Sequence, residues 1–366
     1  MKRESLSDPA PDSWIERARQ ALGNCYREYM ERKEERLASR TNDRVVREFE
    51  WGLDWTNGWP CANQCSPADG NPGVRLAFLN KAAVRDSDGF FAYQVPSDFH
   101  CANGRLQFTS AVKTPHSENN RVHAQWFPAS RDRKRAVLVL PHWNAQAHQH
   151  MALCRALRFF GISALRLSLP YHDLRMPAEL HRADYAVSSN LARTIDSTRQ
   201  AVIDARSCLD WLQAQGYESF GIVGTSLGSC YAFLTSAHDR RLHANAFNLF
   251  SLYFSDVVWT GLTTRHIRQG LDGHVSLEQL RDSWEVISPA TYLDRYAKLH
   301  KKSLFIYGTC DTTFLPEFSR EMIEQARRRN IGLKLVVLPC GHYTLGETPF
   351  KYIDGYQICS FFLRTL

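Results

Sequence analysis

The sequence contains no uninterrupted apolar stretch of about 18 residues, the length that a membrane-spanning helix needs. The first five residues, Met1-Lys2-Arg3-Glu4-Ser5, are mainly polar, and no apolar segment of the signal-peptide kind follows them. The ten cysteines are scattered, and several lie within apolar segments, where a thiol usually serves as a small hydrophobic side chain. We therefore expect a cytoplasmic protein with no stable membrane insertion.

The sequence also lacks a stripe of basic residues interleaved with aromatic ones, which is typical of a nucleic-acid-binding surface. The net charge of +7 comes from 45 basic and 38 acidic residues that lie in mixed clusters, such as Glu31 to Arg36. We interpret these clusters as solvated surfaces and expect no nucleic-acid partner.

A regular set of metal ligands is missing too. Cys61 and Cys65 are followed by His100 and Cys101, and together they could form a zinc site. Their spacing is irregular, and the loop around the first two is rich in Asn, Asp, Gly and Pro. We therefore expect no metal, and zinc at these residues is the alternative.

Continuous apolar runs alternate with helical patterns over the C-terminal two thirds of the chain. Runs that are apolar on both faces predict a mostly parallel sheet covered by helices on both sides. Before them, residues 106–112 and 121–127 alternate between apolar and polar, which predicts an antiparallel hairpin. The runs lie at 136–140, 162–169, 220–223, 244–250, 303–307 and 333–338. One helical pattern follows the first run and ends at residue 160, and the others lie at 193–215, 227–237, 316–329 and 352–366.

The first hundred residues have a different pattern. Residues 13–40 carry apolar side chains at helical spacing, which predicts an amphipathic helix lying on the rest of the protein. Residues 50–103 are aromatic but broken by glycine and proline, which predicts an irregular layer. We divide the chain into an N-terminal extension, 1–103, and a main domain, 104–366, with a helical cap insertion at about 251–302.

A serine lies between two glycines where a predicted strand turns into a helix: Gly224-Thr225-Ser226-Leu227-Gly228. Side chains at the glycine positions would collide across such a tight turn, so the glycines allow the serine to be exposed at its tip. The helix that begins at Leu227 directs free backbone N–H groups toward this serine and favours negative charge there. The alternative is a helix-capping serine in an ordinary turn.

An acid and a histidine follow the serine along the chain. A serine hydroxyl becomes a nucleophile when a histidine, oriented by a carboxylate, accepts its proton. Asp311 follows the run at 303–307 and His342 follows the run at 333–338. Each lies just past the C-terminal end of a strand, where ligands bind open α/β sheets. A capping or core histidine is the alternative for His342.

In these three motifs and their order, residues 104–366 resemble the α/β-hydrolase superfamily of serine esterases and lipases. The resemblance implies an α/β-hydrolase fold in which Ser226 is the nucleophile, His342 the general acid–base and Asp311 the orienting acid. Asp256, one strand earlier, is the alternative acid. The resemblance further implies a small-molecule ester or thioester substrate and no cofactor.

The resemblance also implies an oxyanion hole. One N–H would come from Leu227 and another from the loop Pro141-His142-Trp143-Asn144. Many members carry His-Gly in this loop, so Trp143 and Asn144 are a departure from the family. Trp143 can still supply a backbone N–H, and Asn144 could add a side-chain donor.

Several properties stay open. Aromatic residues at and after the run at 244–250 indicate either an apolar substrate pocket or the packing of the cap, and the loop 169–175 either binds substrate or is merely pinned in place. The protein could be a homo-oligomer. A peptidase of the prolyl-oligopeptidase-like kind and a non-catalytic binding protein are the alternative functions, although residues 1–100 show no propeller repeat. The aromatic residues are Phe247, Phe250, Tyr253, Phe254 and Trp259.

Overall fold

The computed structural model describes residues 14–40, 43–64, 70–130 and 134–366. Over these residues, nine strands form one sheet in the order β1-β2-β3-β5-β4-β6-β7-β8-β9. The first three strands are antiparallel, as is the β3–β5 pair, and the six strands β5, β4, β6, β7, β8 and β9 are parallel. This confirms the predicted hairpin and the mostly parallel sheet. The strands are β1 (His100–Ala102), β2 (Arg105–Thr109), β3 (Arg121–Phe127), β4 (Arg135–Leu140), β5 (Ser163–Leu167), β6 (Ser219–Thr225), β7 (Leu242–Asn248), β8 (Lys302–Gly308) and β9 (Leu333–Leu338).

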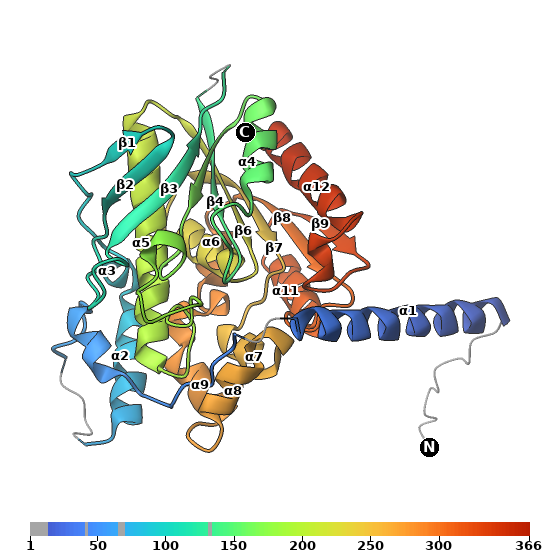
Figure 1. The fold of residues 1–366 in the computed structure, drawn as a ribbon, viewed down its shortest axis with the longest axis horizontal. Coiled ribbons are helices and arrows are strands. Elements are labelled where there is room, and N and C mark those ends of the chain that lie inside the picture. The colour runs from blue at the N-terminus through green and yellow to red at the C-terminus, as the bar shows by residue number, and fades with distance from the viewer. Residues whose placement is uncertain (1–13, 41–42, 65–69, 131–133) are drawn as a thin grey trace, which may run out of the picture.

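Helices cover both faces of this sheet (Figure 1). Along β4, Leu138 and Leu140 belong to the apolar cluster that contains α5 and α6, whereas Val137 and Val139 belong to the cluster that contains α4 and α12. A strand buried on both faces has no polar side to show, and this explains the continuous apolar runs. The helices are α1 (Trp14–Ala38), α2 (Pro72–Arg85), α3 (Ser87–Phe90), α4 (Met151–Phe159), α5 (Leu191–Ala214), α6 (Leu227–Ala237), α7 (Phe254–Thr260), α8 (Arg265–Leu271), α9 (Leu277–Ser283), α10 (Leu293–Ala297), α11 (Pro316–Arg328) and α12 (Phe350–Thr365).

The segment after β4 differs from its prediction. A helical segment was expected between the loop 141–144 and residue 160, but α4 begins only at Met151, and the residues before it form turns. Asn144 and His150 have positive φ angles of 59° and 63°, which end any helical path. The buried Arg166 donates to the carbonyl groups of Gln146 and Gln149, so these groups are satisfied without a helix.

The N-terminal extension is more regular than predicted. Within the segment expected to be irregular, Asn71 caps the helix α2 by accepting hydrogen bonds from two backbone N–H groups, and Pro72 occupies the first helical position. Asn80 of α2 donates to the carbonyl group of Asp282 and accepts from the N–H of Val286, so α2 packs against the insertion between β7 and β8. The strand β1 joins the sheet before residue 104.

The helix α1 lies on the protein along only part of its length. Met30, Glu34 and Ala38 are buried at four-residue spacing, whereas the preceding turns extend beyond the rest of the chain (Figure 1). There Leu22 is 71% exposed and Tyr29 is 59% exposed. The expectation that the whole amphipathic helix packs on the protein was therefore wrong for its first half, and so was the solvated interpretation of the charged cluster at Glu34.

Between β7 and β8 the chain forms the short helices α7 to α10, consistent with a helical insertion. Their apolar side chains join the same cluster as α5 and α6, including Phe254 and the fully buried Trp284. Among the helices of the described residues, none is long and apolar enough to cross a bilayer.

Candidate active site

Ser226 occupies the turn between β6 and α6 with φ 54° and ψ −121°, a conformation that L residues rarely adopt. The flanking glycines permit this turn by close backbone approach. A Cβ atom on Gly224 would lie 2.0 Å from the carbonyl oxygen of Gly228, and one on Gly228 would lie 2.4 Å from the carbonyl oxygen of Leu140. The steric explanation of both glycines is therefore correct.

The structure brings Ser226, His342 and Asp311 into one chain of hydrogen bonds. The Oγ atom of Ser226 lies 3.0 Å from Nε2 of His342, and Nδ1 of His342 lies 3.1 Å from Oδ2 of Asp311. Asp311 accepts a hydrogen bond from the N–H group at Nδ1, so Nε2 of the neutral ring is an acceptor that faces the hydroxyl of Ser226.

The acid and the histidine are held rigidly. Oδ1 of Asp311 accepts hydrogen bonds of 2.8 Å from the backbone N–H groups of Thr313 and Phe314. The ring of Phe314 stacks on that of His342 at 5.4 Å between centroids, with an angle of 4° between the planes. The carboxylate therefore keeps its second oxygen directed at the imidazole.

Opposing effects act on the pKa of His342. Burial disfavours the charged imidazolium, but the negative charge of Asp311, the hydrogen bond to it and the charge of Glu34 outweigh burial, so the pKa is raised above its ordinary value. The site thus favours the protonated form of the His342 ring.

Asp256, the alternative acid, lies in α7 and forms an ion pair with Arg281. It also accepts a hydrogen bond of 3.0 Å from the hydroxyl of Ser255. These contacts account for both of its carboxylate oxygens, and the geometry favours Asp311 as the partner of His342.

The proposed oxyanion loop is fixed by its side chains. The indole N–H of Trp143 donates to the carbonyl group of Ala183 at 2.9 Å, and Oδ1 of Asn144 accepts from the N–H of Ala183 at 2.8 Å. The backbone N–H of Asn144 donates to Nε2 of His172. Asn144 therefore retains only its side-chain NH2 group as a donor, whereas Trp143 lines the cavity beside Ser226 and Leu227.

The loop 169–175 supports this arrangement. Because Nε2 of His172 accepts from Asn144, its proton lies on Nδ1, which donates to the carbonyl group of Pro170 at 2.8 Å. Burial lowers the pKa of His172 to about 4, so the ring stays neutral. Asp173 pairs with Arg166, and Arg175 pairs with the buried Asp204. These polar side chains pin loops in place.

His142 contacts a second histidine. Its Nδ1 lies 2.9 Å from Nε2 of His150. Burial lowers the pKa of His142 well below the ordinary range, and the nearby rings of His150 and His342 lower it further. A neutral His142 supports the loop that begins at Pro141.

A cavity of about 50 Å³ lies beside the serine. Of the aromatic residues expected to form a pocket, Tyr253 and Phe254 line it. The other three serve packing: Phe247 and Phe250 contact the ring of Phe233 in the core, and Arg268 lies over the ring of Trp259. The lining residues are Trp143, Val187, Ser226, Leu227, Cys230, Ser251, Tyr253, Phe254, Val257, Val258, Thr263, Thr264, Thr313 and Phe314.

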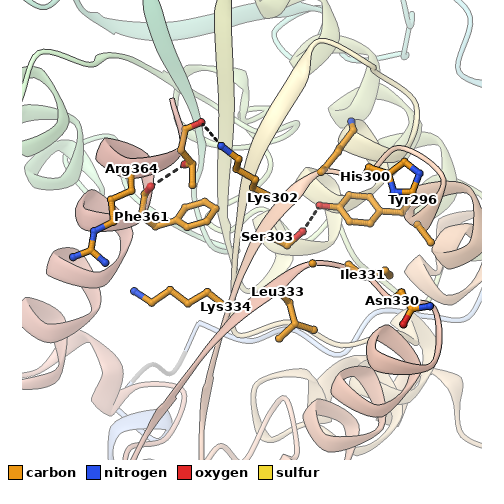
Figure 2. A pocket seen from close by; sticks show the side chains of 14 residues that line it. Tyr296, His300, Lys302, Ser303, Asn330, Ile331, Leu333, Lys334, Phe361 and Arg364 are labelled. Carbon is orange, nitrogen blue, oxygen red and sulfur yellow. Dashed lines mark hydrogen bonds between the residues drawn. The ribbon is translucent and has the colours of Figure 1, made fainter.

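A larger cavity, of about 560 Å³, lies elsewhere (Figure 2). It is lined by Lys302, Leu333 and Phe361, among others, and therefore lies at the amino ends of β8 and β9. Ser226, Asp311 and His342 follow the carboxyl ends of their strands, so this cavity is at the opposite edge of the sheet.

The possible zinc ligands lie in different elements of the structure and differ in solvent exposure. Cys61 is buried, and its thiol donates to the carbonyl group of Leu79, while His100 and Cys101 are exposed on β1. Cys65 lies outside the described residues.

Comparison with known proteins identifies the fold. No protein-family model and no curated protein sequence matches the chain. Solved structures do match the chain. The chain is similar to an acetyl xylan esterase from Paenibacillus sp. R4, with 12% identity, a TM-score of 0.54 and 83% of this chain covering 97% of that chain. It has the α/β-hydrolase fold.

Two further α/β-hydrolase structures are similar to it. Est1E from Butyrivibrio proteoclasticus, with ferulic acid bound, has 14% identity and a TM-score of 0.50, and 67% of this chain covers 95% of that one. The acylaminoacyl peptidase from Pyrococcus horikoshii has 11% identity and a TM-score of 0.55, and 72% of this chain covers 41% of that one. The fold predicted from the three motifs is thereby confirmed.

Sequence reasoning missed one residue that contacts the candidate site. Glu34 of α1 accepts backbone hydrogen bonds from Tyr343 and Thr344, directly after His342. Its position in a run of charged residues concealed it. The signal that could have revealed it is its four-residue spacing from Met30 and Ala38, which places all three on one helical face.

Replacing Gly228 with alanine tests the turn. The added Cβ would lie 2.4 Å from two backbone oxygens, those of Leu140 and Pro141, which cannot move aside cheaply. We expect Gly228→Ala to lower the free energy of unfolding by about 1–3 kcal/mol, measured by urea denaturation. Gly355→Ala in α12 is the control, because its Cβ meets nothing within 4 Å and should stabilise the helix by about 0.5–1 kcal/mol. Equal effects of the two substitutions would contradict the steric explanation.

Proposed function

We propose that the protein is a serine hydrolase that cleaves a small carboxylic ester or thioester through an acyl-enzyme on Ser226. The observation that carries the proposal is the continuous hydrogen-bond chain from Ser226 through His342 to Asp311. The strained turn that exposes the serine supports it, because such strain persists at functional sites.

In the proposed mechanism, Oγ of Ser226 attacks the substrate carbonyl carbon while Nε2 of His342 accepts the hydroxyl proton. Asp311 stabilises the imidazolium that forms. His342 then gives this proton to the leaving alcohol or thiol, and the acyl group stays on the serine. A water molecule, deprotonated by His342, attacks the acyl-enzyme, releases the carboxylic acid and restores the serine hydroxyl.

We further propose that the backbone N–H groups of Leu227 and Trp143 bind the oxyanion. Leu227 is the first residue of α6, so its N–H has no partner within the helix. Trp143 lines the same cavity and is held by its indole bond to Ala183 and by stacking on His266. Fixed donors need no rearrangement when negative charge develops.

The size of the cavity supports a short acyl group. About 50 Å³ corresponds to only a few water-sized volumes of about 10–15 Å³ each. The lining is mainly apolar, with Val257, Val258 and Phe254 contributing from α7. An acetyl to butyryl group matches this space and this chemistry.

Ser226→Ala tests the nucleophile. Without the hydroxyl no acyl-enzyme can form, so turnover of p-nitrophenyl acetate and butyrate should fall by about 10⁶-fold. Circular dichroism should show an unchanged fold. Ser39→Ala, at an exposed serine that directly follows α1, is the control. Full turnover by Ser226→Ala would disprove the proposed function, and a peptide amide assayed in parallel separates esterase from peptidase activity.

The acid is tested by comparing Asp311→Asn with Asp256→Asn. The first substitution removes the carboxylate that fixes the tautomer of His342, so kcat should fall by about 10⁴-fold. The second substitution removes the ion-pair partner of Arg281. The side chain of Arg281 is 49% exposed and can be solvated instead, so kcat should stay within a few-fold of the wild type. The reverse order of effects, measured with p-nitrophenyl butyrate, would assign the role to Asp256.

The acyl-chain preference is tested with p-nitrophenyl esters of increasing length. Because the cavity is small, kcat/KM should fall at least tenfold between the butyrate and the octanoate. Val257→Ala removes two methyl groups from the lining and should shift the preference toward longer chains. Val74→Ala, at an exposed valine of α2, is the matched control. Rising kcat/KM up to the octanoate would exclude a short-acyl pocket.

A further inference from the structure

A carboxylate of the N-terminal extension binds the loop that carries His342. Glu34 is fully buried, and its oxygens Oε2 and Oε1 accept hydrogen bonds of 2.9 and 2.8 Å from the backbone N–H groups of Tyr343 and Thr344. On the other side of His342, a Cβ on Gly341 would lie 2.3 Å from Cδ of Glu34. One side chain therefore contacts the backbone both before and after the histidine.

The extension holds this loop at further points. The hydroxyl of Tyr26 donates to the carbonyl group of Pro339 at 2.5 Å. Lys33 pairs with Glu347 at the other end of the loop. Arg44 donates to the hydroxyl of Tyr343 at 2.6 Å. Of these contacts, only that of Glu34 is a buried charge bound to the backbone next to His342.

The geometry makes the position of His342 sensitive to Glu34. Burying a carboxylate is costly unless hydrogen bonds satisfy it. The burial of Glu34 therefore depends on the two hydrogen bonds from the loop, and the loop in turn is held in place by them. The loop cannot shift without breaking them. A displacement of about 1 Å in a catalytic group can cost about 10²-fold in rate.

We propose that Glu34 is a positioning residue for His342. Its buried carboxylate fixes the loop so that Nε2 stays within hydrogen-bonding distance of Oγ of Ser226, and its charge assists Asp311 in stabilising the imidazolium. This inference rests on the proposed function. It assigns to the N-terminal extension a direct part in the site.

One other carboxyl near this contact titrates near neutral pH: burial raises the pKa of Asp354 to about 7, and its charge acts on Cys340. Asp354 accepts hydrogen bonds from Asn248, whereas the charges that act on His342 are those of Asp311 and Glu34. Burial raises the pKa values of the thiols of Cys310 and Cys340 and of the phenol of Tyr343, so all three stay neutral. Burial keeps His142 neutral. Asp311 is the remaining charged group that faces His342. A change in the pH profile on substituting Glu34 would therefore report on the histidine.

The test uses Glu34→Gln and Glu34→Asp in the full-length chain. Glutamine keeps one acceptor but loses the charge, so kcat/KM for p-nitrophenyl butyrate should fall about tenfold. The acid limb of its pH profile should move to lower pH, because the charge of Glu34 helps to raise the pKa of His342. Aspartate keeps the charge on a shorter side chain, so it should lower kcat/KM but leave the acid limb closer to that of the wild type.

Glu35→Gln is the matched control, one residue further along α1 at an exposed position, where the carboxylate pairs with the exposed Arg265. It should change neither kcat/KM nor the acid limb. Labelling of Ser226 by a fluorophosphonate, followed against pH, repeats the measurement without an assumption about the acyl group.

The outcomes separate the two proposals. If Ser226→Ala keeps full turnover, the proposed function fails whatever Glu34 does. If Ser226→Ala is inactive but Glu34→Gln has the kcat/KM and acid limb of the wild type, the positioning role fails alone. A loss of kcat/KM with an unmoved acid limb, or a failure of both Glu34 variants to fold by circular dichroism, would overturn the proposal by making Glu34 a purely structural residue.

Discussion

The close approach of the first turn of α6 to the end of β4 is the constraint on which the site depends. The backbone at Gly228 lies so near the carbonyl groups of Leu140 and Pro141 that no side chain fits between them. This contact sets where α6 begins and leaves Ser226 in its strained turn, held by a hydrogen bond of 2.8 Å from its N–H to the carbonyl group of Asn248. The same contact brings the loop at Trp143 beside the serine.

From that turn outward, hydrogen bonds fix the orientation and tautomer of each neighbouring group. Thr313 and Phe314 orient Asp311, which fixes the proton of His342 on Nδ1. In the same way, Pro170 fixes the proton of His172 on Nδ1, and His172 then accepts from Asn144. Groups that are already oriented need little reorganisation when charge develops, which is how electrostatic catalysis lowers a barrier.

The sequence was sufficient to predict features that depend on local patterns. The parallel strands follow from apolar runs, and Ser226, Asp311 and His342 follow from their places after those runs. The sequence could not predict features decided by distant contacts. Glu34 is buried by residues more than 300 positions away, and the only local feature that separates it from the exposed Glu35 is its four-residue spacing from Met30 and Ala38. The turns at 141–150 depend on the buried Arg166, which satisfies their carbonyl groups from a neighbouring strand.

The division of the chain at residue 103 describes its sequence better than its packing. The strand β1 pairs with β2, α2 binds the insertion through Asn80, and Glu34 binds the loop of His342. The extension thus contacts the sheet edge, the insertion between β7 and β8, and the histidine loop. A segment that looks like an addition in sequence is therefore, in contacts, part of the unit that positions the site.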